Sequence, residues 1–183
     1  MKQKDFKETM KQKIKVLVLS EGCAPVISED GDWIDLRAAE DFHLDSPSAE
    51  MLKKHNGNRY RKLIIPRGIV PLGVAMQLPK GMEGHIAPRS SSDKKFSIIQ
   101  SNCVGVVDQT YCGPNDQWGM PVRALSEVNI KKGDRVCQFR IVPSQKATLW
   151  QRIKWLLSSG IEIELVDHLD NPDRDGFGHS GVK

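Results

Sequence analysis

Short apolar runs separated by turn residues dominate the middle of the chain. Within residues 62–88, the runs LII, GIVPLGVAM and GHIA are divided by prolines, glycines and the polar turn KGME. Runs of this length with such punctuation are typical of strands in an all-β sandwich or barrel. Because the same pattern continues further along the chain, we predict strands there too, in residues 96–100, 117–125 and 128–130.

Strands are also predicted on either side of this central region. Residues 14–19 (IKVLVL) form an apolar run, and residues 161–166 (IEIELV) alternate between apolar and polar. Residues 135–142 (RVCQFRIV) follow a lysine-glycine-aspartate turn. Side chains alternate along a strand. Gln138 is therefore expected on one face and four residues on the other: Arg135, Cys137, Phe139 and Ile141.

Helix is predicted at two places only. Residues 148–158 (TLWQRIKWLLS) carry leucine and isoleucine at helical spacing, with Thr148 as a possible N-cap and Gly160 beyond the end. The polar segment 43–61 is broken by proline and by Asn-Gly-Asn, and it indicates a surface insertion with one short helix at 48–54.

Length and charge indicate one compact domain. The chain has 183 residues and is 39% apolar, which suits a single core. We expect a basic N-terminus over residues 1–12, a β domain over 13–170 and a glycine-rich arm over 171–183. Five lysines of the first thirteen residues account for much of the net charge of +4. Because a nucleic-acid binder would show a basic face within the fold, no nucleic-acid partner is expected.

The cysteines and the apolar runs bear on location. No C-x-x-C pair occurs, so buried free thiols in a reducing compartment are predicted for the four cysteines: Cys23, Cys103, Cys112 and Cys137. No apolar run reaches membrane-spanning length, and the lysine-rich start lacks the apolar segment of a signal peptide. We therefore expect a cytoplasmic protein without a membrane partner.

Residues 102–113 (NCVGVVDQTYCG) are the first candidate for chemistry. The β-prone apolar run is interrupted by Gly105, and the pattern predicts a hairpin with Asp108 at its bend. A glycine inside a strand often marks the close approach of another molecule, so the backbone here could read a planar ligand beside Asp108 as a base. The alternative is a surface turn with a solvated aspartate.

Two further segments carry charged candidates. Asp35 lies within an apolar run and needs a partner or a metal, because an isolated buried carboxylate is costly. A salt bridge to Arg37 or another arginine is the structural alternative. Arg89 with Ser90 and Ser91 offers a guanidinium and hydroxyls that suit a phosphate cradle.

The C-terminal segment RDGFGHSG combines glycines with functional side chains. Glycine-rich backbone can wrap closely around phosphates, and Arg174 can supply charge. Phe177 can stack on a ring, while His179 and Ser180 can donate hydrogen bonds. Such an arm could close as a lid that expels water, and the alternative is a disordered tail.

Five segments together resemble, in order, the five motifs of the homotrimeric deoxyuridine triphosphatases (dUTPases). They are DWIDLRAAED, APRSSS, NCVGVVDQTYCG, KGDRVCQF and RDGFGHSG. The resemblance implies a jelly-roll-like β-barrel subunit with short helical insertions and a flexible C-terminal arm. It also implies a homotrimer in which each site is assembled from several subunits.

The resemblance implies roles for residues of the central motif. Asp108 matches the aspartate that deprotonates the water attacking the α-phosphate. Tyr111 matches the tyrosine packed under the deoxyribose, where it excludes a ribose 2′-hydroxyl. Asn102 and the backbone that follows, Gly105 included, match the segment that reads uracil.

The other motifs imply phosphate and metal contacts. Arg89, Ser90 and the adjacent Ser91 would contact phosphates, as would Gln138. Asp35 would hold Mg2+ through water. The arm would close over the base and the γ-phosphate with five residues: Arg174, Phe177, Gly178, His179 and Ser180.

The activity implied is magnesium-assisted hydrolysis of dUTP to dUMP and pyrophosphate, which removes dUTP from the nucleotide pool and supplies dUMP for dTMP synthesis. A related deoxycytidine triphosphate deaminase would need a general-base glutamate on the strand after the hairpin, and residues 120–125 (MPVRAL) offer none. A non-catalytic nucleotide-binding module is the third alternative. The presence of both Asp108 and Tyr111 argues against it.

Overall fold

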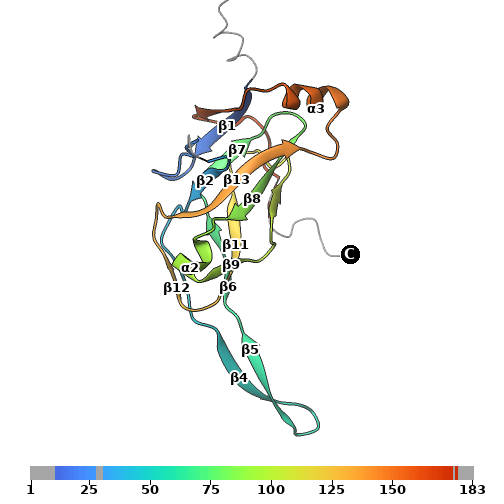
Figure 1. The fold of residues 1–183 in the computed structure, drawn as a ribbon. Helices are drawn as coiled ribbons and strands as arrows, with labels where there is room; N and C mark the ends of the chain where they lie inside the picture. Colours follow the sequence, from blue (N-terminus) through green and yellow to red (C-terminus); the bar gives the residue numbers. More distant parts are fainter. Residues whose placement is uncertain (1–10, 28–30, 175, 177–183) are drawn as a thin grey trace, which may run out of the picture.

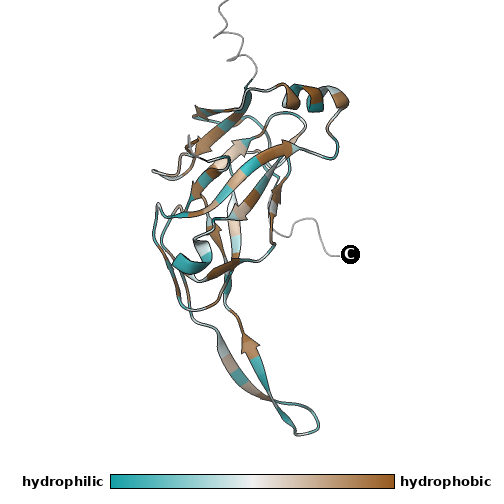
Figure 2. Ribbon diagram, viewed as in Figure 1, coloured by the Kyte–Doolittle hydropathy of each residue, from teal (hydrophilic) through white to brown (hydrophobic). Residues whose placement is uncertain are grey.

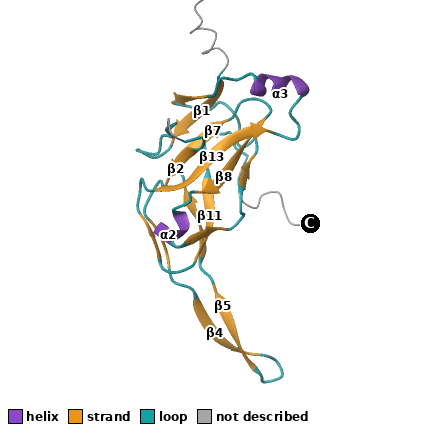
Figure 3. Ribbon diagram, viewed as in Figure 1, coloured by secondary structure: helices purple, strands orange, loops and turns teal. Residues whose placement is uncertain are grey.

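The computed structural model describes residues 11–27, 31–174 and 176, and strands are the predominant secondary structure of this part of the chain (Figures 1 and 3). Its helices are α2 (Ser92–Phe96) and α3 (Leu149–Leu156). The strands are β1 (Gln12–Val18), β2 (Ile34–Arg37), β3 (Phe42–Leu44), β4 (Ser48–Lys53), β5 (Arg59–Ile64), β6 (Arg67–Pro71), β7 (Val74–Gln77), β8 (Met82–Pro88), β9 (Ile98–Gln100), β10 (Gly105–Val107), β11 (Gly119–Ala124), β12 (Val128–Ile130), β13 (Arg135–Pro143) and β14 (Ile161–Val166).

The described strands form five sheets. Two of them matter most for the site: the sheet ordered β10-β8-β13-β2 and the sheet ordered β6-β11-β9. A third sheet, β14-β1-β7, joins the first and last strands in parallel, and β12-β3 and β4-β5 are two-stranded. The predictions of strands in the centre and on both sides of it are confirmed, except at Phe96, which ends α2, a helix that was not predicted; the strand there begins at Ile98.

Alternation along the strands builds the core. On β1, Ile14 and Val16 are buried while Lys13 and Lys15 are exposed. In Figure 2 the strands of the body accordingly carry hydrophobic segments next to hydrophilic ones. A strand that is buried on one face alternates between apolar and polar residues, because successive side chains point to opposite sides.

The central strand β8 packs closely on aromatic rings. A Cβ atom added to Gly84 would lie 2.8 Å from the ring of Trp118. That ring meets Phe139 edge-on, with 5.2 Å between the ring centres. The missing side chain therefore lets β8 approach the aromatic pair, which is buried between the sheets.

The predicted C-terminal helix is confirmed. Thr148 is the N-cap of α3, and its hydroxyl accepts a hydrogen bond from the backbone N–H of Gln151 while the Gln151 side chain accepts one from the Thr148 N–H. This reciprocal arrangement is a capping box. Gly160 follows with a φ of 129°. Figure 2 shows hydrophobic and hydrophilic bands alternating along the helix.

The helix predicted at residues 48–54 is wrong, because this segment is strand β4. It pairs antiparallel with β5, and the turn between them is closed by a bond from Lys54 N to Asn58 O of 2.7 Å. Gly57 adopts a φ of 84°, which favours glycine. The surface location expected for residues 43–61 is confirmed, because the hairpin projects from the body (Figure 1).

The expected facing of residue 135 is also wrong. A register shift between Arg135 and Cys137 marks a β-bulge in β13. The bulge turns Arg135 outward, whereas Cys137 and its alternating neighbours Phe139 and Ile141 are buried as predicted.

The cysteine prediction holds for three thiols. Cys23, Cys112 and Cys137 are buried and free, but Cys103 is exposed in a loop with a φ of 58°. Burial raises the pKa of the Cys112 and Cys137 thiols, because a thiolate is poorly solvated there. No helix in the described residues is long and apolar enough to cross a membrane.

Candidate active site

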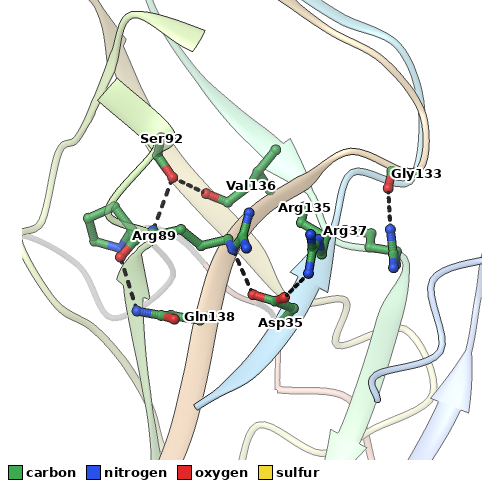
Figure 4. A network of polar contacts seen from close by, with 9 residues as sticks. Asp35, Arg37, Arg89, Ser92, Gly133, Arg135, Val136 and Gln138 are labelled. Atoms are coloured by element: carbon green, nitrogen blue, oxygen red, sulfur yellow. Dashed lines mark hydrogen bonds and ion pairs between the residues drawn. The ribbon is translucent and has the colours of Figure 1, made fainter. Parts of the chain in front are cut away.

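Asp35 lies between two arginines at one end of the β10-β8-β13-β2 sheet. Its Oδ1 is 2.8 Å from Nε of Arg89, and its Oδ2 is 2.9 Å from a terminal nitrogen of Arg135 (Figure 4). The alternative of a salt bridge with another arginine is therefore confirmed. Arg37 instead donates to the Gly133 carbonyl at 2.8 Å. We call Asp35, Arg89, Arg135 and Gln138 the arginine cluster.

Strand pairing explains why these residues meet. Asp35 on β2 lies opposite Gln138 on β13, and Gln138 in turn lies opposite Ala87 near the end of β8. Arg89 follows directly after β8, so the same end of the sheet presents its side chain. The Gln138 side chain is half-buried and donates to the Pro88 carbonyl at 3.4 Å, a long contact that a phosphate oxygen could replace.

Ser92 fixes the backbone of Arg89. Its hydroxyl accepts the Arg89 N–H at 3.0 Å and donates to the Val136 carbonyl at 2.8 Å (Figure 4). Sequence reasoning missed this residue, although it is the third serine of the run that drew attention to Ser90 and Ser91. Those two serines are exposed beside Arg89 and remain available to a ligand.

Asp108 stands at a turn after β10. The Tyr111 N–H donates to the Asp108 carbonyl at 3.0 Å, so the predicted bend is present. The hairpin is wrong in its pairing, since β10 pairs with β8 and residues 111–113 belong to none of the described strands. The Tyr111 hydroxyl donates to the Gln117 carbonyl at 2.9 Å, which holds the ring partly against the core.

The uracil-reading candidates lie just before β10 and at its first residue. Gln100 is buried, and its amide N–H groups donate to Oδ1 of Asn102 at 3.0 Å and to the Ile86 carbonyl at 3.0 Å. A Cβ atom on Gly105 would approach the amides of both residues at about 3.4 to 3.5 Å. The structure thus brings Asn102 and Gly105 together, and Gln100 orients Asn102, a role that the sequence analysis did not assign.

The start of the C-terminal arm reaches the turn after β10 within one chain. A terminal nitrogen of Arg174 lies 2.8 Å from Oδ2 of Asp108 and 2.7 Å from the Thr110 hydroxyl. Gly176 lies so close to Tyr111 that an added Cβ atom would be 2.8 Å from its hydroxyl oxygen. Phe177, Gly178, His179 and Ser180 lie outside the described residues.

Two acids anchor this start of the arm. Asp116 is buried, and its carboxylate accepts the N–H of Gly113 at 2.8 Å and that of Arg174 at 3.0 Å. Asp173 accepts two hydrogen bonds from Asn115, at 2.7 and 2.8 Å, and these bonds lower its pKa. Neither acid was singled out from the sequence.

The arginine cluster and Asp108 lie at opposite ends of β8. Because β10 runs antiparallel to β8, Val107 is level with Gly84, while Arg89 follows the far end of β8. Five residues of strand span roughly 16 Å. One chain therefore brings Asp108, Tyr111 and Arg174 together at one end of β8. It forms the arginine cluster at the other end, and it does not bring these two groups into contact.

Comparison with known proteins identifies the family. The family model for dUTPase matches residues 42–181. The chain belongs to the dUTPase family. This match begins after Asp35, whose assignment depends on its contacts with Arg89 and Arg135.

Similar proteins include several dUTPases. An SPbeta prophage-derived deoxyuridine 5′-triphosphate nucleotidohydrolase of Bacillus subtilis is 43% identical over 85% of this chain and 87% of its own length. A deoxyuridine 5′-triphosphate nucleotidohydrolase of Orientia tsutsugamushi is 30% identical over 95% of this chain and its full length. The crystal structure of a dUTPase from Streptococcus mutans gives a TM-score of 0.56 at 21% identity, covering 70% of this chain and 91% of that chain.

The fold comparison extends to a phage enzyme. A mutant dUTPase from phage phi11 of Staphylococcus aureus, described with a structural Mg(II) ion, has a TM-score of 0.56 at 18% identity and covers 74% of this chain and 94% of that chain. These likenesses confirm the mostly-β, jelly-roll-like dUTPase fold predicted from the sequence.

The dUTPase chain has no preformed cage of protein ligands for a metal in its described residues. They contain no group of three or more His, Cys, Asp or Glu side chains that could hold an ion. Both oxygens of Asp35 already accept from arginines, so the site lacks the free negative charge that attracts a cation. Mg2+ usually keeps several waters and takes much of its coordination from substrate phosphates. The residues present fit only an ion that arrives with a triphosphate and meets Asp35 through water.

Proposed function

We propose that this chain hydrolyses dUTP to dUMP and pyrophosphate, which removes dUTP from the nucleotide pool and supplies dUMP for dTMP synthesis. Membership of the dUTPase family and the names of its relatives support this activity. The observation that carries the proposal is the exposed Asp108 beside Tyr111 at the turn after β10.

Asp108 would act as the general base. One side-chain oxygen, Oδ2, is held by Arg174, while Oδ1 has no partner in the described part of the chain and can accept a proton from water. The water oxygen would form a bond to the α-phosphorus as the bond to the bridging oxygen breaks. Pyrophosphate would leave, and Asp108 would take the proton.

The arginine cluster would neutralise the triphosphate. Arg89 uses Nε for Asp35, so its terminal nitrogens can form charge-assisted bonds with phosphate oxygens. Ser90, Ser91 and Gln138 would add neutral donors. Positioning and charge neutralisation dominate phosphoryl chemistry, and bound Mg2+ would supply further neutralisation of phosphate charge. Asp35 would meet that ion through water.

Nucleoside selection would come from the segment before and after β10. Uracil would be read by Asn102 and by the backbone at Gly105, where a Cβ atom would lie in contact with the Asn102 amide. Tyr111 would pack under deoxyribose. Arg174 would bring the arm across this site, and Phe177, Gly178, His179 and Ser180 would close over the base and γ-phosphate.

A homotrimer would unite the two groups of residues. Their separation along β8 supports a site that takes Asp108 from one subunit and the arginine cluster from another. The outer face of the β6-β11-β9 sheet supports subunit contact, since Ile69 and Ile99 are exposed on it. Closed symmetric oligomers commonly bury such faces.

The deaminase alternative is disfavoured by β11, which contains no glutamate. Incubation of the protein with dUTP, dCTP and dTTP in the presence of Mg2+ tests the proposal directly. Pyrophosphate release from dUTP alone, without ammonia, is expected. Ammonia release from dCTP would establish a deaminase instead, and binding without turnover would establish a regulatory module.

Three buried free thiols support residence in a reducing compartment, and we place the protein in the cytoplasm. Fractionation of the producing cell checks this assignment.

A further inference from the structure

The hairpin of β4 and β5, residues 48–64, is the most prominent feature that the proposed activity does not use. It projects from the body as a two-stranded ribbon (Figure 1). Almost all of its residues are exposed. Such a ribbon buries little of its own surface, so its side chains are free to meet a partner.

The charge of the hairpin differs from that of the rest of the chain. It holds five of the 27 basic residues and one of the 23 acidic residues, so the remainder of the chain carries 22 of each. The five cations lie within ten consecutive residues that contain no acid: Lys53, Lys54, Arg59, Arg61 and Lys62. The hairpin thus carries a charge of +4, while the charges of the remaining chain sum to zero, because acids elsewhere offset the lysines of the N-terminus.

Strand register places like charges on one face. Lys53 lies directly opposite Arg59, and Arg61 lies on the same face opposite Met51. Like charges directly opposite destabilise a ribbon. None of the five cations forms an ion pair with an acid in the described part of the chain, so a polyanion would relieve this repulsion.

We propose that this hairpin binds the phosphate backbone of double-stranded DNA without sequence preference. A two-stranded ribbon fits the major groove, and lysines and arginines on it can meet phosphates on both sides. From the sequence, no nucleic-acid partner was expected, because the net charge of the chain is small. A net value does not show that one hairpin carries a charge of +4.

An acidic protein is a poorer fit for the same surface. Protein interfaces are built around apolar anchors and are depleted in lysine. Tyr60 is the single aromatic residue of the outer part, and the Lys54 ammonium group lies over its ring at 5.8 Å. Of the exposed apolar side chains, Leu63 lies nearer to the body than this cationic part, and Met51 lies within it, opposite Arg61.

The hairpin is separate from the catalytic residues. It leaves the body between β3 and β6, whereas the arginine cluster and Asp108 lie on the β10-β8-β13-β2 sheet and the turn after β10. Changes in its charge should therefore leave dUTP hydrolysis intact.

The test measures binding of the full chain to a short labelled DNA duplex by fluorescence anisotropy, between about 50 and 200 mM salt. If all five cations of one hairpin meet phosphates, log K should fall with log salt at a slope of about −4.5. The double variant Lys53→Glu/Arg59→Glu should bind roughly tenfold more weakly or worse, with a shallower slope.

The matched control is Lys146→Glu/Lys154→Glu, which makes the same charge change at exposed positions in and before α3. It should bind as the unaltered chain does, and both variants should keep the subunit number and the dUTP turnover. Equal weakening by both variants would overturn the proposal, as would absence of duplex binding. Tighter binding of a single strand or of polyglutamate, or loss of subunit assembly in the hairpin variant, would also overturn it.

Discussion

Asp108 owes its suitability for proton transfer to its position at a turn rather than to burial. Its side chain is 60% exposed, and Arg174 holds one of its two oxygens. The guanidinium fixes the carboxylate without occupying the oxygen that would face a water molecule. In one chain the proposed base, Tyr111 and the first cation of the arm thus lie together.

Replacement of Asp108 by asparagine should lower kcat by roughly 10²- to 10⁴-fold, because the amide cannot accept the proton. Binding of a non-hydrolysable dUTP analogue should stay close to that of the unaltered protein, since the shape of the turn is kept. Steady-state kinetics and calorimetry measure the two quantities. Asp170→Asn, at an exposed position, is the control, and unchanged turnover in Asp108→Asn would exclude its role as base.

Asp116→Ala should lower the free energy of unfolding by about 1 to 3 kcal/mol, because two backbone N–H groups lose their acceptor. The carboxylate that accepts from both Gly113 and Arg174 would be lost, so trypsin should cut after Arg174 faster than in the unaltered chain. Urea unfolding and a proteolysis time course measure these effects. Asp170→Ala should change neither the free energy of unfolding nor the rate of cleavage. If Asp116→Ala were as stable as the unaltered protein, the Asp116 hydrogen bonds would not contribute to stability.

The family motifs in the sequence pointed to the residues proposed to contact ligand but not to those that hold them in place. Asp108, Arg89 and Gln138 belong to recognisable motifs, and the structure gives each the exposure that a ligand needs. Asp116 and Ser92 bind groups that are 58 and 44 positions away in the chain. Contacts between residues so far apart in the sequence depend on the folded topology, which the periodicity of a local sequence pattern does not reveal.

At the scale of elements, the strands were predictable where one face is buried. The alternation in β1 and in most of β13 reports that burial directly, whereas β14 alternates in sequence although its residues are mostly half-buried. The β4–β5 ribbon has almost no buried face, so its charges hid the strand pattern and favoured a helix. The turn after β10 was predicted. The strand that pairs with β10 is β8, which lies earlier in the chain, and a local sequence pattern cannot predict this pairing.

Gly84→Ala should test how tightly β8 packs on the aromatic pair. The added methyl group would lie 2.8 Å from the Trp118 ring, and overpacking of this kind costs about 1 to 3 kcal/mol. Chemical denaturation measures the loss. In the double variant Gly84→Ala/Trp118→Phe the two costs should sum to more than the measured total, because the smaller ring makes room. Strict additivity would contradict a clash at this site.

At the scale of the whole molecule, the distance along β8 would make assembly of the proposed trimer part of the chemistry. The arginine cluster offers charge for a triphosphate, and Asp108 with Tyr111 offers a base and a sugar platform, but at opposite ends of one strand. A trimer in which these ends face each other across subunits would complete each site.

Mixing two inactive variants should therefore restore activity. Arg89→Ala and Asp108→Asn subunits, unfolded and refolded together, would form hybrids in which some sites receive an intact residue from each subunit. Pyrophosphate release from dUTP measures the recovery. The control mixes Asp108→Asn with Tyr111→Ala, which damage the same half of the site and should give no recovery. Absence of recovery in the first mixture, with mixed oligomers present, would place the whole site within one chain.

The parallel pairing of β14 with β1 has a consequence for biosynthesis. Residues 12 to 17 pair with residues 161 to 166, so this pairing of β1, the first described strand, cannot form until β14, the last, has been synthesised. Pairing over such a separation is slow, because a long loop has to close first. The nascent polypeptide therefore leaves the ribosome with one edge of β1 unpaired, and the β14-β1-β7 sheet is completed only after translation.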